Sequence, residues 1–401
     1  MPPLTIRAYT ATTALGRGLE AQARALRERR SGLRRNDFVP LAPGEAPLDC
    51  WIGRVEGLED APLPAALSQW DCRNNRLAWL SLQQDGIVEA IAAAVARHGA
   101  ERVAIIVGTS TSSIGATEAA YTHLHGEPPR FASDPGPPVL HTPHSLGAFV
   151  AAATGLRGPC VTVATACSSS AKVFAQAARL IAAGVVDAAL VGGVDTLCGS
   201  VLFGFNSLQL VSAEPCKPFD AQRVGLSLGE AGGFAVLERR DDEHAAQGLE
   251  LRGYGESSDA HHMSSPHPQG LGARLAMVDA LARAGIEAGE VGYLNLHGTA
   301  TPANDQVEAL AIAGLFPPHL HASSTKGWTG HTLGAAGIVE SAYALLALER
   351  GELPGTLNSV EPDPGNGPQI RFDNAQHSIR YAMNNSFGFG GNNCSLVFAR
   401  A

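Results

Sequence analysis

The sequence lacks paired cysteines, long apolar runs and an excess of positive charge, and each absence excludes a class of protein. The seven cysteines are scattered with no two at CxxC spacing, so neither a disulfide framework nor a zinc cluster is expected. No apolar run approaches the ~20 residues that span a bilayer, and the first residues do not resemble a secretion signal, so we expect a cytoplasmic protein without membrane insertion. A net charge of −9 disfavours nucleic acid and anionic membranes as partners.

The composition, 45% hydrophobic and 17% charged over 401 residues, is typical of a compact protein with a large core. Short β-branched runs alternate with longer segments of helical period, which predicts a layered α/β protein with helices packed on sheets. The expected strands are 102–108, 160–164, 188–194, 232–237, 292–296 and 395–398, and the expected helices are 75–97, 168–183, 271–284, 305–315 and 335–348.

Two stretches, 160–184 and 293–314, each place a strand, a turn and a helix next to polar residues. A charged connector at 241–248 separates them. This repetition indicates two related halves, which we divide into 1–245 and 246–401. Residues 126–143 include six prolines, too many for a helix or a central strand, so they are expected to form a loop or cap.

Cys167 is the first candidate nucleophile, because a buried strand and a tight turn lead to a helix that starts at about this residue. Unpaired N–H groups at a helix N-terminus stabilise a thiolate and can bind an oxyanion, so a thiol there can have a pKa below the ~8.5 of a free cysteine. Ala166 and the serines 168–170 leave room for a substrate. On this context alone, a cysteine that only caps the helix or fills the core remains an equal alternative.

A second cluster of polar residues begins at His297, at the end of an expected strand. Thr299 and Thr301 follow in a turn, and Asp305 and Glu308 then share one face of the next helix. Loops carried on a rigid scaffold are where catalytic residues concentrate.

Lys326 and His331 lie in a glycine-rich loop before an apolar helix. Most histidines of a chain are surface or satisfied core residues, but two imidazoles that donate to one carbonyl would stabilise an enolate. His297 and His331 are candidates for such a pair. Lys326 is expected to form an ion pair with Glu308, and a solvated lysine is the alternative.

The segment 383–398 couples a hydrophobic strand to a turn with three glycines between Phe387 and Asn392. Glycine tolerates the positive φ angles and close backbone approach that such a turn needs. A nucleotide-phosphate loop is disfavoured, because no helix follows and no P-loop lysine is present. A second oxyanion N–H at Phe389, with its ring closing over the substrate, fits better.

Together these segments resemble the elongating β-ketoacyl-acyl-carrier-protein synthases of type II fatty-acid and polyketide systems, and the match spans nearly the whole chain. The blocks that carry the resemblance are Thr165-Ala-Cys-Ser-Ser, Leu296-His-Gly-Thr-Ala-Thr-Pro, Thr325-Lys-Gly-Trp-Thr-Gly-His, Asn385-Ser-Phe-Gly-Phe-Gly-Gly and Cys216-Lys-Pro-Phe-Asp-Ala-Gln-Arg before Gly229-Glu230. The resemblance implies the thiolase-like fold, a five-layer αβαβα sandwich of two pseudo-symmetric halves.

The resemblance also implies a Cys–His–His mechanism. Cys167 would accept an acyl group, and His297 and His331 would promote decarboxylation of a malonyl thioester whose carbanion attacks that acyl group. The N–H groups of Cys167 and Phe389 would form the oxyanion hole. The further implied roles are organisation of the histidines by Lys326 and Glu308 with support from Asp305, pantetheine binding by Thr299 and Thr301, and substrate contacts by Phe205 and Phe387.

No metal or redox cofactor is implied, because the substrates arrive on the phosphopantetheine of an acyl carrier protein. A homodimer is expected, or a heterodimer with a related chain-length-factor-like subunit. Arg73 and Arg76 lie three apart at the start of a helix and match basic positions of the family's carrier-docking helix, so they are candidates for binding an acidic carrier. A solvated face is the alternative.

The sequence also departs from the family pattern. Residues 6–16 lack the usual glycines, Val224 stands where an Asp often follows the arginine, Asn392 replaces a common Thr, and the indole of Trp328 comes between Lys326 and His331 in the chain. These departures indicate a specialised member, similar to synthases of aryl-polyene pigment pathways.

Three other functions compete with a condensing enzyme. A non-catalytic chain-length-factor-like subunit would lack the nucleophile, whereas Cys167 is present. A degradative thiolase would carry a Cys-x-Gly motif near its C-terminus, whereas Cys394 is followed by Ser-Leu-Val. A cysteine hydrolase needs an Asn or Asp that orients the histidine, and Asn295 is too close along the strand for that role.

Overall fold

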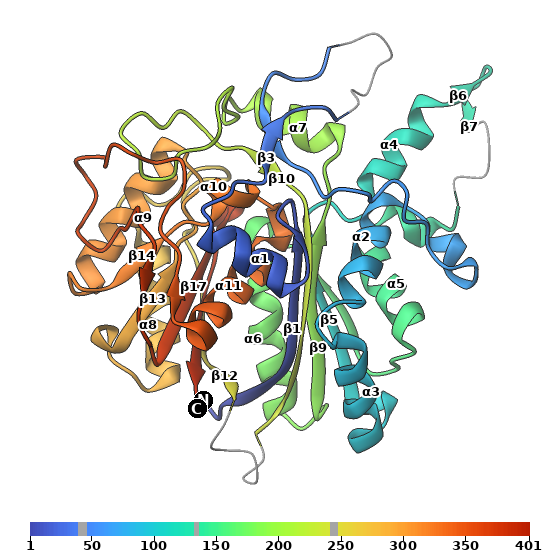
Figure 1. The fold of residues 1–401 in the computed structure, drawn as a ribbon. Helices are drawn as coiled ribbons and strands as arrows, with labels where there is room; N and C mark the ends of the chain where they lie inside the picture. The colour runs from blue at the N-terminus through green and yellow to red at the C-terminus, as the bar shows by residue number, and fades with distance from the viewer. Residues whose placement is uncertain (39–45, 132–135, 241–247) are drawn as a thin grey trace.

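The computed structural model describes residues 1–38, 46–131, 136–240 and 248–401, which fold around one strongly curved sheet of 11 strands (Figure 1). Along the sheet the strands are β14 (His321–Ser323), β13 (Val291–Asn295), β17 (Tyr381–Gly388), β18 (Asn392–Arg400), β12 (Leu249–Ser258), β1 (Leu4–Thr13), β11 (Ala231–Arg239), β9 (Ala188–Asp195), β5 (Val103–Gly108) and β8 (Cys160–Val163), with β2 (Gly16–Arg17) paired to β1.

The sheet is built from two copies of one topology. In the first half β8, β5 and β9 run parallel, β11 pairs antiparallel with β9, and β1 pairs antiparallel with β11. In the second half β14, β13 and β17 run parallel, β18 pairs antiparallel with β17, and β12 pairs antiparallel with β18. The strands also follow in the same chain order in both halves, so the prediction of two related halves is confirmed. The two halves of the sheet join where β1 pairs antiparallel with β12.

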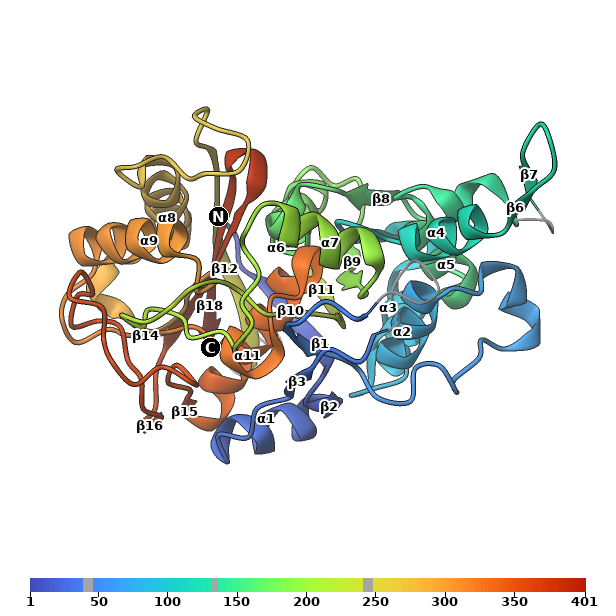
Figure 2. The same ribbon diagram turned by 90° about the horizontal axis from the view of Figure 1, so that it is seen from above.

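Helices form the other layers, as Figure 2 shows from above. Between the two half-sheets lie α6 (Ser169–Ala182) and α11 (Ala336–Arg350). The outer face of the first half carries α2 (Arg73–Leu82), α3 (Ile87–His98) and α5 (Ser145–Thr154), and that of the second half carries α8 (Leu271–Ala284) and α9 (Pro302–Leu315). This order of layers is the predicted αβαβα sandwich.

The central layer explains why α11 is apolar on every side: each residue of 336–348 is buried, because both half-sheets contact this helix. The two central helices approach each other very closely at their N-termini. A Cβ built on Gly337 would lie 2.3 Å from the backbone nitrogen of Ala171, so this position accepts only a hydrogen atom. The contact brings together the two turns that precede α6 and α11, and those turns carry Cys167 and His331.

The expected helix 75–97 is wrong, since it is two helices, α2 and α3. The chain breaks at Asp85 and Gly86, whose φ angles of 52° and 74° lie in the left-handed region. The break places the Asp85 carboxylate where it accepts hydrogen bonds from the Thr10 hydroxyl and the Leu19 N–H. The first strand of each half, β1 and β12, was not among the expected strands, because neither shows a simple alternation: both bury residues on both faces.

The side chain of Trp328 packs away from His331, toward α1, although Trp328 stands between Lys326 and His331 in the sequence. It belongs to α10 (Lys326–Thr329), and its fully buried indole donates from Nε1 to the carbonyl of Ala25 in α1 (Leu19–Arg27) at 3.2 Å. The indole therefore links α1 to α10, the short helix just before His331.

A small hairpin of β6 (Leu124–His125) and β7 (Arg130–Phe131) leads into the proline-rich segment, which also contains a 3₁₀ turn at Pro138–His141. The connector 241–248 and the boundary drawn between residues 245 and 246 fall almost entirely on 241–247, outside the described residues. No helix in the described ranges is both long enough and apolar enough to cross a membrane.

Candidate active site

Cys167 lies in the turn that joins β8 to α6. A 3₁₀ turn covers Ala166–Ser168, and Ala166 has a φ of 52°, a left-handed conformation that is unfavourable for alanine. The backbone N–H groups of Cys167 and Phe389 both point at the Cys167 sulfur. This is the arrangement expected of an oxyanion hole, although Phe389 lies at the other end of the chain.

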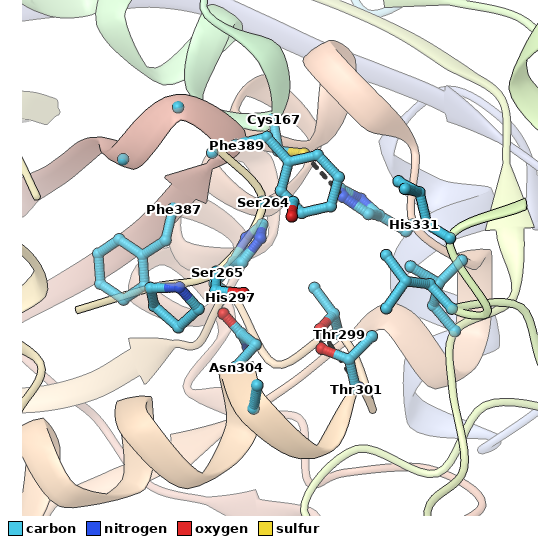
Figure 3. Close-up of a pocket in the computed structure, with 18 of the residues that line it drawn as sticks. Cys167, Ser264, Ser265, His297, Thr299, Thr301, Asn304, His331, Phe387 and Phe389 are labelled. Carbon is cyan, nitrogen blue, oxygen red and sulfur yellow. Dashed lines mark hydrogen bonds between the residues drawn. The ribbon is translucent and has the colours of Figure 1, made fainter. Parts of the chain in front are cut away.

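His297 and His331 meet the sulfur in one buried cluster (Figure 3). A hydrogen bond of 3.0 Å joins His331 Nε2 to Cys167 Sγ, and the two imidazole rings lie 5.4 Å apart at 86°. Sγ and one nitrogen of each ring all lie within 4.8 Å of one another. The fold thus brings together three side chains that the sequence separates widely, as the proposed mechanism requires.

Burial sets the charge state of this cluster. It raises the pKa of the Cys167 thiol to about 11, because desolvation outweighs the attraction of the Lys326 cation and the two N–H donors. Burial also lowers the pKa of His297 and of His331 well below their usual value, and the Lys326 cation lowers both further. The resting pair is therefore a neutral thiol and a neutral imidazole. The low thiol pKa that a helix N-terminus suggests is wrong for this state.

Lys326 makes a different ion pair from the one expected. Its ammonium contacts the Glu340 carboxylate on α11 and donates to the His297 carbonyl. Glu308 instead accepts from the backbone N–H groups of His297 (2.9 Å) and Gly298 (2.7 Å). The predicted Lys326–Glu308 pair is wrong because the lysine enters the central layer, whereas Glu308 faces the turn after β13.

Glu340 was missed in the sequence, although a signal was present: it is the one charged residue of the apolar stretch 336–348. Burial raises the pKa of Glu340 to about 7 even though Lys326 opposes that rise. Burial likewise raises the pKa of Glu308 to about 7. Both carboxylates hold the His297 segment, one through Lys326 and one directly.

Asp305 holds the turn after His297 in place. The Asp305 carboxylate accepts from the N–H groups of Ala300 (3.2 Å) and Phe219 (2.8 Å). The hydroxyls of Thr299 and Thr301 are 2.8 Å apart and line the cavity in front of the histidines. Both hydroxyls therefore lie in the cavity that contains Cys167.

A cavity of about 360 Å³ contains these groups. Phe205 on α7 (Gly199–Ser207) stacks on Phe389 with ring centroids 5.8 Å apart, and Phe387 lies 6.0 Å from the His297 ring. All three rings line the cavity, and their contact with a substrate stays a prediction. Wall residues that the sequence did not suggest are Leu208, Leu210, Leu226, Ser264, Ser265 and Asn304.

Asp195 is a second buried residue that sequence reasoning missed. Its carboxylate accepts from the Thr109 hydroxyl (2.6 Å), from the N–H of Ser110 (2.8 Å), from both donors of Thr111 (2.8 and 2.9 Å), and from the N–H of Gly334 (2.7 Å). It ties the loop after β5 to the turn that follows His331. An aspartate at the end of a buried apolar strand was the available signal.

Arg73 and Arg76 have partners within the chain. Arg73 forms a bidentate pair with the buried Glu230 (2.8 and 2.6 Å), and Arg76 forms one with Asp71 (2.6 Å twice). The side chain of Arg73 is only 19% exposed. These pairs offer no free basic face for an acidic carrier, so the geometry gives no support to the docking role.

The cysteine and the two histidines also form the kind of donor set that zinc accepts. Within the described ranges it is the one group of three such residues whose ligand atoms converge. A metal on Sγ would block thioester formation, and the expectation of a metal-free site stays a prediction.

The fold and the site define a condensing enzyme with the thiolase-like architecture. Two family profiles match: "Beta-ketoacyl synthase, N-terminal domain" at residues 70–243 and "Beta-ketoacyl synthase, C-terminal domain" at 249–360. The chain belongs to the β-ketoacyl synthase family, a family of acyltransferases.

Among curated proteins, the "3-oxoacyl-[acyl-carrier-protein] synthase 2" of Staphylococcus aureus is 35% identical over 312 residues, 75% of this chain and 77% of the relative. The mitochondrial 3-oxoacyl-[acyl-carrier-protein] synthase of Arabidopsis thaliana is 40% identical over 265 residues, 61% of this chain and 57% of the relative. A solved ketosynthase (ApeO) in complex with its chain length factor (ApeC), from Xenorhabdus doucetiae, is 37% identical with a TM-score of 0.87, over 100% of this chain and 98% of the other.

Glu340→Gln is expected to lower the free energy of unfolding by about 3–5 kcal/mol, because it leaves the buried Lys326 charge without its counter-ion. Urea denaturation measures the change. The double variant Lys326→Met/Glu340→Gln should regain most of the lost stability. A single variant as stable as the wild type would show that this ion pair is not what holds the lysine.

The pH dependence of Cys167 alkylation tests the neutral resting state. With a thiol pKa of about 11, the rate of reaction with iodoacetamide should rise roughly tenfold per pH unit from pH 7 to about 10, since only the thiolate reacts. Mass spectrometry of the Cys167 peptide follows the reaction. A rate that is already constant above pH 7 would instead indicate a thiolate–imidazolium pair.

Proposed function

We propose that this chain elongates an acyl group by decarboxylative condensation, with both substrates delivered on the phosphopantetheine arm of an acyl carrier protein. The observation that carries the proposal is the convergence of Cys167, His297 and His331 within one cavity. Membership of the β-ketoacyl synthase family supports the reaction class. No cofactor beyond the carrier's own arm is required.

In the first half-reaction, Cys167 Sγ attacks the carbonyl carbon of the incoming thioester. Because burial opposes a free thiolate, the proton moves to His331 Nε2 as the new bond forms. The N–H groups of Cys167 and Phe389 hold the oxyanion. The intermediate collapses to the acyl-enzyme, and the carrier leaves as a thiol with the proton that His331 returns.

In the second half-reaction, His297 and His331 donate hydrogen bonds to the carbonyl oxygen of the malonyl thioester. Their low pKa values keep both rings neutral, so they serve as donors without a net charge in the cavity. Loss of carbon dioxide leaves an enolate on that oxygen. Its carbon attacks the acyl group, and Cys167 leaves as a thiolate that takes up a proton from water, since its own proton left with the first carrier. The Thr299 and Thr301 hydroxyls hold the pantetheine arm meanwhile.

For the pathway and the partner we propose aryl-polyene-type elongation in a dimer. The 37% identity with the ketosynthase that was solved with its chain length factor supports a partner chain. The aryl-polyene assignment is supported by the departures of this sequence from the family pattern at Val224 and Asn392. The edge strand β8 supports a partner chain, because it pairs only with β5 among the described strands and leaves backbone groups open to pairing. A second copy of this chain or a chain-length-factor-like subunit would cover it. The presence of Cys167 disfavours the chain-length-factor role for this chain itself.

Acylation by thioesters tests the nucleophile. Wild-type protein incubated with a panel of acyl-carrier thioesters should gain the mass of one acyl group, and Cys167→Ala should gain none. Intact-mass spectrometry reads the result directly. No mass gain in the wild type, or an equal gain in the variant, would remove Cys167 from its role.

His297→Ala separates the two half-reactions. Because the hydrogen bond to Sγ comes from His331 and not from His297, we expect acylation to persist, while decarboxylation of the malonyl carrier falls about 10²–10³-fold from the loss of one donor to the enolate oxygen. Release of labelled carbon dioxide measures the second step. Decarboxylation at the wild-type rate would exclude His297 from it.

A further inference from the structure

A hydrogen bond between Lys172 and Asn392 links the two segments that form the oxyanion hole. Lys172 lies in the first turns of α6, just after Cys167, and its ammonium donates to Asn392 Oδ1 at 3.2 Å. Asn392 is the first residue of β18 and follows directly on the glycine turn Phe389–Gly391. It is also one of the positions where the sequence departs from the family pattern, with asparagine in place of a common threonine.

Gly388, the residue just before the glycine turn, contacts the backbone of the turn that carries Cys167. A Cβ on Gly388 would lie 2.8 Å from the Thr165 carbonyl oxygen and 3.2 Å from the Cys167 nitrogen, so the two backbones are in contact. The N–H groups of Cys167 and Phe389 therefore share an oxyanion only while these two turns keep their spacing. An error of about 1 Å in such a placement can cost two orders of magnitude in rate.

The far side of the glycine turn is held by the loop 259–267, which is largely exposed. Gly390 N donates to the Met263 carbonyl (2.7 Å), Asp259 N donates to the Gly391 carbonyl (3.0 Å), and Asn393 Nδ2 donates to Asp259 (3.0 Å). None of these bonds reaches α6, the helix that follows the nucleophile. In the part of the chain that is described, Lys172–Asn392 is the one side-chain hydrogen bond between α6 and residues 388–393.

We propose that Lys172 is a positioning residue for acyl transfer, which fixes the Phe389 N–H against the Cys167 turn through Asn392. The inference rests on the proposed function, since it concerns the acylation step. A hydrogen bond from an ammonium is stronger than one between neutral groups, and it is shielded here by a half-buried setting. Asparagine presents its oxygen one bond farther from the backbone than threonine does, so it meets the lysine.

The test uses Lys172→Met, which keeps the length of the stem and removes the donor, and Asn392→Leu, which removes the acceptor. Both variants should lower the rate constant of acylation at saturating carrier thioester about tenfold and leave KM unchanged. This loss is smaller than the 10²–10³-fold fall in rate that follows removal of a whole oxyanion donor. Alkylation of Cys167 by iodoacetamide should stay within about twofold of the wild type, because that displacement forms no oxyanion. Asn392→Asp keeps an acceptor and should acylate like the wild type.

Arg179→Met is the matched control, because Arg179 lies on the same helix but pairs with Glu256, away from the glycine turn. It should acylate normally. Lys172→Met that acylates at the wild-type rate overturns the inference, and so does an equal fall in alkylation, which would mean that the Cys167 turn itself has moved. A wild-type protein that forms no acyl-enzyme overturns the proposed function and this inference together.

Discussion

The exclusion of water from the contact between Cys167 and His331 governs the rest of the site. It makes the thiol a weak acid and the imidazole a weak base, so the pair rests without charge. In water the same two groups would titrate near neutrality. The chemistry then depends on donors that are already in place when charge develops, because solvent cannot reorganise around it.

Those donors are held by charges that are themselves buried. Glu308, Asp195 and the Lys326–Glu340 pair each lie within the core and have backbone or side-chain partners there, although Glu340 Oε2 makes no hydrogen bond within the described residues. A buried charge is tolerated only when such partners are present, and the partners are fixed in return. These contacts therefore hold the turns around His297 and His331 in place.

The duplicated fold shows how the geometry arises. Ala166 before α6 and Leu333 before α11 have nearly the same unusual φ, 52° and 56°, and each begins a short 3₁₀ turn that leads into a central helix. Equivalent turns of the two halves thus meet at the centre. One half supplies the sulfur, and the other supplies both imidazoles.

Much of this was predictable from the sequence. Motif order identified the nucleophile, both histidines and the layered fold, because strand–turn–helix units leave a local pattern. The ion-pair partner of Lys326 was not predictable. Lys326 pairs with Glu340 rather than Glu308, because the partner depends on which layer of the fold the lysine side chain enters. The thiol pKa also escaped prediction, because a helix N-terminus is visible in the sequence and the depth of burial is not. The same holds for Asp195, whose partners come from distant loops.

The close contact at Gly337 limits which residues around the site can be substituted. With no room for a methyl group between the central helices, substitution there would push the sulfur and the imidazole apart. Phe205, Leu208 and Ser264 lie on α7 and surface loops instead, and they line the cavity without supporting that contact. Substrate range can thus diversify along the cavity wall while the reacting atoms keep their places.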